Sequence, residues 1–130
     1  MTRVIRAIYD ELRRPDDQNR YWYGWLTVQA AHALLGLFFT AAAVMLGAPG
    51  AAAWGAVSLI YGLVKEVPDY AQAPSWRNAR DCLRDWLFVV GGAGVAATLH
   101  AGSGWFWLAM LAVVAGLAIG TYQRAARALS

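Results

Sequence analysis

Charge is missing from two long stretches of this chain. No Lys, Arg, Asp or Glu occurs from position 21 to 64 or from 86 to 123. Charged residues make up only 15% of the sequence, whereas soluble domains need about a quarter to cover their surface with polar groups. Each uncharged stretch is long enough to cross a bilayer twice. The sequence therefore excludes an ordinary soluble fold and predicts an integral membrane protein.

The chain also has only one cysteine and no continuous stripe of basic residues. Cys82 is the only cysteine, which excludes an internal disulfide. The 11 basic residues sit beside the apolar runs and alternate with 8 acids, a pattern that excludes a nucleic-acid partner. Membrane lipid is the expected partner. The small-residue runs at 91–94 and 116–120 offer faces for close helix packing, within the protein or between copies in a homo-oligomer.

Two short turn sequences divide the uncharged stretches. Gly-Ala-Pro-Gly at 47–50 is a strong turn signal, and Ala-Gly-Ser-Gly at 101–104 divides the second stretch in the same way. The predicted fold class is all-α, a single transmembrane domain over 1–130 with four transmembrane helices arranged as two helical hairpins. The helices are expected at about 22–46, 51–67, 76–100 and 105–122, after an amphipathic cytoplasmic head at 1–20.

The positions of the charges predict the orientation. All of them lie in the head, in the segment 65–85 and in the tail that begins at 124. With four crossings these three segments share one side of the membrane, and the two turns on the other side are uncharged. This is the positive-inside pattern, so both termini are predicted to be cytoplasmic in a multi-pass protein of the bacterial inner membrane.

The two middle helices would be too short if they stopped at the first charge. Their uncharged parts, 51–64 and 86–100, span only about 21–23 Å at 1.5 Å per residue, less than the roughly 30 Å hydrocarbon core. We therefore expect these helices to extend into the charged segment, or the bilayer to thin locally. Either way, the charged side chains are drawn toward the inner edge of the membrane, where such groups are costly unless they are paired or functional.

Four carboxylates are candidate metal ligands at that edge: Glu66, Asp69, Asp81 and Asp85. The first two share a face of the second helix, although Pro68 can kink or end it. The last two lie in one stripe of the third helix with Arg77 and Arg84. Such an oxygen cluster suits a divalent cation such as Mg²⁺ as a cofactor, or a carboxyl group that holds a proton. The alternative is a belt of salt bridges, and the spacing does not decide between them.

A histidine lies near the middle of the first helix. His32 has Gln29 one turn before it on the same face. Either the two form a buried pair that hydrogen-bonds across helices, or His32 joins a polar cavity with Glu66. In the second case Glu66, Asp81 and His32 are the candidate catalytic residues. The chemistry on offer is general acid–base catalysis or metal-assisted hydrolysis.

Three features are taken together here: His32 in the first helix, "YGLVKEVPDY" at 61–70 and "SWRNARDCLRDWLFVVGGAGV" at 75–95. In this order they resemble the VanZ-like and YfiM-like group of small bacterial membrane proteins. The resemblance covers residues 32–95, and the positions in common are His32, Glu66, Asp69 and Asp81. The chain departs from the group at Asp85, where asparagine is usual, and its glycines come later, at Gly91 and Gly92. In one branch the resemblance implies a link to teicoplanin resistance and the cell envelope.

These observations predict an inner-membrane protein whose carboxylate-rich site binds a cation or a lipid head group and acts in envelope lipid or cell-wall metabolism. A pore-forming, holin-like lysis protein is one alternative. Small size and Gly- and Ala-rich helices favour it, but the crossings lack a polar face to line a channel. A structural or adaptor membrane protein with a charged docking face is another. Whether a reaction is catalysed stays open at this point.

Overall fold

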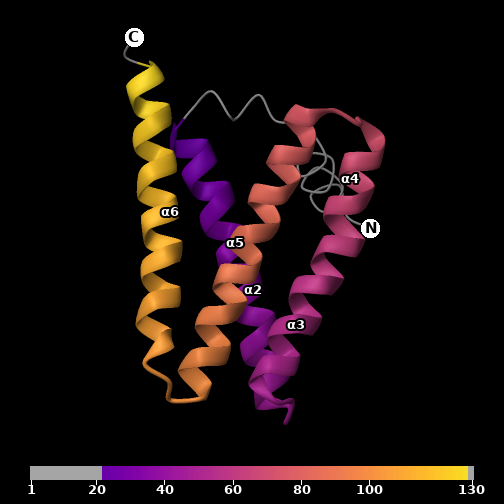
Figure 1. The fold of residues 1–130 in the computed structure, drawn as a ribbon, viewed down its shortest axis with the longest axis vertical. Helices are drawn as coiled ribbons and strands as arrows, with labels where there is room; N and C mark the ends of the chain where they lie inside the picture. The colour runs from indigo at the N-terminus through magenta and orange to yellow at the C-terminus, as the bar shows by residue number, and fades with distance from the viewer. Residues whose placement is uncertain (1–21, 129–130) are drawn as a thin grey trace, which may run out of the picture.

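The structure, a computed structural model, describes residues 22–128 (Figure 1). This part of the chain is helical apart from short turns and contains no strand. Its elements are α2 (Trp22–Met45), α3 (Gly50–Tyr61), the π-helical segment η2 (Gly62–Glu66), α4 (Val67–Gln72), α5 (Trp76–His100) and α6 (Trp105–Ala128). The predicted amphipathic head at 1–20 lies outside the described residues.

The helices form two hairpins whose turns lie at the same end of the bundle, at the bottom of Figure 1. Gly47 in the first turn has φ 96°, and Gly102 in the second has φ 59°. Glycine adopts such left-handed conformations without the strain that a Cβ atom causes. The two turns predicted from the sequence are therefore confirmed, and glycine is what allows the chain to reverse there.

Three of the described helices, α2, α5 and α6, are long and apolar enough to cross a membrane. The fold is thus that of an all-helical, multi-pass membrane protein. The helices next to the charged segment extend into it, as predicted. One helical run continues from Gly50 through η2 to Gln72, and α5 begins at Trp76. At the other end of the chain α6 reaches Ala128, farther than the expected 122.

The core lies where α2 crosses α5, which is the most extensive helix contact. A Cβ atom on Gly36 would strike the backbone of Val89, and one on Gly92 would strike the backbone of Ala33. The two glycines therefore allow the backbones to touch, as small residues do in membrane helix pairs. The small face predicted at 91–94 is confirmed as a packing surface within the protein.

The other two neighbours of α5 are held differently. Two indole groups tie the α3 side to it: Trp54 Nε1 donates to the Val90 carbonyl at 2.9 Å, and Trp86 Nε1 donates to the Ser58 carbonyl at 2.8 Å. On the far side α6 packs on α5 and α2, but its most apolar stretch has no buried residue. The bundle is therefore tight around α2, α3 and α5, and α6 is its open edge.

Candidate metal centre

Helix α5 carries polar side chains on two faces. It is capped by Ser75, whose hydroxyl accepts a hydrogen bond from the Asn78 backbone N–H at 3.1 Å. From this start the helical period places Asn78, Cys82 and Asp85 on one face. That face packs against α2 and the run from α3 to α4, while Arg84, one position before Asp85, lines a pocket shared with α6. The first face builds the candidate site.

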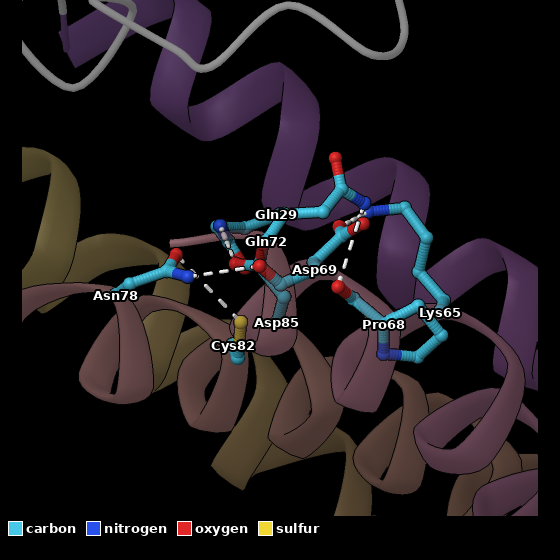
Figure 2. A network of polar contacts seen from close by, with 8 residues as sticks. All are labelled: Gln29, Lys65, Pro68, Asp69, Gln72, Asn78, Cys82 and Asp85. Atoms are coloured by element: carbon cyan, nitrogen blue, oxygen red, sulfur yellow. Dashed lines mark hydrogen bonds and ion pairs between the residues drawn. The ribbon is translucent and has the colours of Figure 1, made fainter. Parts of the chain in front are cut away.

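Asp85 is held in place from α2. Gln29 Nε2 donates a hydrogen bond to Asp85 Oδ1 at 2.7 Å (Figure 2). Gln29 is only 3% exposed, so the contact lies inside the bundle. A neutral amide orients a carboxylate but supplies no positive charge. Asp85 is therefore positioned for a further partner.

Three potential metal ligands meet at this point. His32 from α2, Glu66 from η2 and Asp85 from α5 each offer one ligand atom, and these atoms all lie within 4.8 Å of one another. Glu66 is 7% exposed, and the other two are half-buried. The Tyr61 ring packs edge-on against the imidazole of His32, with 5.8 Å between ring centroids. We call His32, Glu66 and Asp85 the metal cluster.

Several buried polar atoms around the metal cluster have no hydrogen-bond partner among the described residues. They are Glu66 Oε1, Gln29 Oε1 and His32 Nδ1. Buried polar atoms are nearly always paired, and leaving one unpaired costs about 1–3 kcal/mol, more when the group is charged. Unpaired carboxylate, amide and imidazole atoms in one place are what a bound cation or a hydrogen-bond donor would satisfy.

A π-helical turn decides which side chain of η2 reaches the cluster. Pro68 has no backbone N–H, and in an unbroken α-helix its ring would clash with the Val64 carbonyl. The wider turn immediately before it avoids this clash. At about 100° per residue, an α-helix would put Lys65 on the same face as the buried Ser58. The one extra residue in the π turn puts Glu66 there instead, and Glu66 is the buried residue of η2.

The structure does not bring the other two predicted carboxylate ligands into the cluster. Asp69 pairs with Lys65 on the same helical run, and Asp81 pairs with Arg84 at 2.8 Å. Asp81, also a catalytic candidate, lines a different pocket between α5 and α6. Of the four carboxylates, two join His32 in the metal cluster, and the other two form the ion pairs that the salt-bridge alternative describes.

The role of Gln29 could not be predicted in full. The sequence pattern places Gln29 beside His32 on α2 but gives no hint that its partner is Asp85, 56 residues later. The available signal is a pair of polar residues three apart in an otherwise apolar helix, which marks functional positions in membrane segments. Their partner depends on where α2 crosses α5, which is a property of the tertiary packing.

Comparison of the chain with family models, with curated proteins and with solved structures finds no match. The resemblance to the VanZ-like and YfiM-like group stays a prediction. The function is therefore argued from the metal cluster itself.

Proposed function

We propose that the protein binds a divalent metal cation inside its helical bundle, through His32, Glu66 and Asp85. The observation that carries the proposal is the buried Glu66 carboxylate. Its Oε1 has no partner among the described residues, yet a second acid and an imidazole lie within 4.8 Å. A buried carboxylate beside a half-buried one is costly without a compensating charge. A divalent cation would balance both.

The charge that is already present does not replace such a cation. Lys65 is close enough to act on Glu66 electrostatically, but its ammonium group is held by Asp69. The lysine therefore has an acid of its own. Around Glu66 and Asp85 the other described partners are the Gln29 amide, the His32 imidazole, the Tyr61 hydroxyl and the Cys82 thiol, none of which carries a permanent positive charge.

The ligand types favour a transition metal. Mg²⁺ is the expectation for an all-oxygen set of four carboxylates, but the imidazole nitrogen suits Zn²⁺ better, and the two carboxylates also suit Mn²⁺. Ligand atoms on one such metal lie about 3–4 Å apart, so separations of up to 4.8 Å require only a small inward movement of the side chains. Gln29 would orient Asp85 as outer partners commonly orient metal ligands.

Three protein ligands leave a coordination position open. Structural zinc sites use four protein ligands, and catalytic ones keep a position for water or substrate. Metal-assisted hydrolysis of an envelope lipid, one of the chemistries predicted from the sequence, would use this open position. In that case Glu66 and His32 act as metal ligands, and Asp85 takes the place that the sequence prediction gave to Asp81.

Metal binding is tested by isothermal titration of Zn²⁺ and Mn²⁺ into chelator-treated protein in lipid nanodiscs. We expect one ion per chain, with affinity lowered about tenfold or more by Glu66→Gln, Asp85→Asn or His32→Phe. The matched control is Asp81→Asn, which removes an acid outside the cluster and should keep the wild-type affinity. No binding by the wild type, or an equal loss in the control, would overturn the proposal.

The finer membrane arrangement belongs to the same proposal. The run from Gly50 to Gln72 crosses the membrane in addition to α2, α5 and α6, which makes four crossings. Both termini are cytoplasmic in a bacterial inner membrane. The run is roughly 33 Å long at 1.5 Å per residue, enough for the hydrocarbon core. Single cysteines in a Cys82→Ala background test the orientation. An impermeant thiol reagent should label Ser103→Cys in intact cells and leave Ser130→Cys unlabelled. The reverse pattern would refute the orientation.

A further inference from the structure

A second polar region lies between α5 and α6, across α5 from the metal cluster. It is a pocket of about 310 Å³ between the start of α5 and the end of α6. Its charged lining residues are Arg77, Arg80, Asp81, Arg84, Arg124 and Arg127. The aspartate is paired with Arg84. Among the described residues that line it, positive charge is thus in strong excess, and we call it the arginine pocket.

An apolar groove adjoins the arginine pocket. The groove has a volume of about 390 Å³ and follows the contact between α5 and α6, with Leu87, Ala112 and Ile119 among its lining residues. Arg84 and Arg124 line both the groove and the arginine pocket. The two hollows therefore adjoin at these arginines, with the charged one at the end of the bundle and the apolar one nearer its middle.

The junction of the two hollows is built by specific packing. The Arg124 guanidinium lies over the Trp25 ring, 4.1 Å from its centroid. This cation–π contact fixes the position of the Arg124 charge along the helix axis. A Cβ atom on Gly120 would strike the Trp25 ring, so glycine at this position lets the ring lie against α6. The change from charged to apolar lining therefore occurs at one level along the helices.

We propose that this double hollow binds one anionic phospholipid of the surrounding membrane, with its phosphate among the arginines and an acyl chain in the groove. Guanidinium groups match phosphate oxygens in charge and geometry. Basic pockets between membrane helices bind anionic lipid head groups. The order of charged and apolar lining follows the order of head group and chain in a bilayer. Since the apolar stretch of α6 is unburied, the groove is open to lipid.

The phosphate carries the specificity. A zwitterionic head group such as choline would bring its own positive charge into the arginine pocket, so an anionic lipid is expected to bind more tightly. A soluble phosphate would leave the apolar groove empty. Neither statement depends on a metal ion, so an experiment can refute the lipid site without refuting metal binding, and the reverse also holds.

Native mass spectrometry of the full chain in detergent tests the lipid site. The probes are dioleoylphosphatidylglycerol and dioleoylphosphatidylcholine, titrated at equal concentrations. We expect a single tight adduct with the first lipid, about tenfold or more stronger than with the second. Arg77→Gln and Arg80→Gln should each weaken it about fivefold, because one basic group near anionic lipid contributes about that factor. Lys65→Gln removes the same charge outside the arginine pocket and should have no effect.

Two further comparisons separate a lipid site from a site for a soluble anion. Ala112→Phe fills the groove and should weaken the lipid adduct, whereas Ala118→Phe, exposed on α6 outside the groove, should not. Inorganic phosphate at millimolar concentration should fail to displace the lipid. Equal binding of both lipids, or displacement by phosphate alone, would overturn the proposal. Circular dichroism of each variant verifies that the helices are intact.

Discussion

Two faces of α5 carry charged groups of opposite sign. Toward α2 and η2, Glu66 and Asp85 are withdrawn from solvent beside His32, and several of the polar atoms lack described partners. Toward α6, arginines surround a pocket that opens to the outside. The two signs are separated by one step of the helix, because Asp85 lies about 100° around the axis from Arg84. The charged segment is therefore neither one salt-bridge belt nor one carboxylate cluster: it contributes to an acidic cluster on one face of α5 and to an arginine-lined pocket on another.

The largest expected effect comes from a substitution that disturbs the contact between α5 and α2. Gly92→Ala should lower the free energy of unfolding by about 2 kcal/mol more than Gly91→Ala, measured by denaturant titration in micelles. Both substitutions gain the same helix propensity. However, a Cβ on Gly92 would strike the α2 backbone, and one on Gly91 would meet only the end of the Val113 side chain, at 2.8 Å. Equal losses would show that the α2–α5 contact is no tighter than the α5–α6 contact.

The next effect tests whether the π turn presents Glu66 to the metal cluster. With Pro68→Ala the reason for the wider turn is removed, so the helix can close to α geometry. Lys65 would then take the face that Glu66 now occupies, and Glu66 would turn away from the cluster. We expect the Zn²⁺ affinity to fall about tenfold while the lipid adduct is unchanged, since the arginine pocket takes no residue from η2. Pro74→Ala, in the turn before α5, is the control. An unchanged affinity in Pro68→Ala would mean that the turn is held by tertiary packing and not by the proline.

This dependence on one turn shows how far the sequence alone can reach. The hairpins and the charged end follow from local signals, namely uncharged runs and turn glycines, and these predictions hold over the described residues. The metal cluster instead depends on where α2 crosses α5 and on a single extra residue in η2. A constant period of about 100° per residue contains neither. The same period places Asp81 and Asp85 in one broad stripe, yet helix packing gives them different neighbours: Asp85 contacts Gln29 of α2, and Asp81 lines the pocket shared with α6.

Those two aspartates sharpen the comparison, because one chemical change should have different results. Asp81→Asn leaves Arg84 without its acid and should strengthen the phosphatidylglycerol adduct about fivefold, as measured by native mass spectrometry. Asp85→Asn should leave that adduct unchanged. It should raise the stability of the metal-free protein by about 1 kcal/mol, because it removes the half-buried negative charge beside Glu66 while its side-chain carbonyl still accepts from Gln29. If the two variants behave alike, the two sides of α5 are not electrostatically separate.

The smallest effect comes from the one feature that both sides share, the start of α5. Ser75→Ala removes the hydroxyl that accepts the Asn78 N–H and should cost about 0.5–1 kcal/mol in the free energy of unfolding. The first turn of α5 carries Arg77 toward the arginine pocket and Asn78 toward α4, so fraying it should weaken metal and lipid binding alike, each less than about twofold. Ser103→Ala, which removes the hydroxyl that bonds the Trp105 N–H at the opposite end of the bundle, should change neither affinity. A loss of affinity for only one of the two ligands would show that the first turn of α5 supports only that ligand's site. The two proposed sites would then lie on one helix but depend on different parts of it.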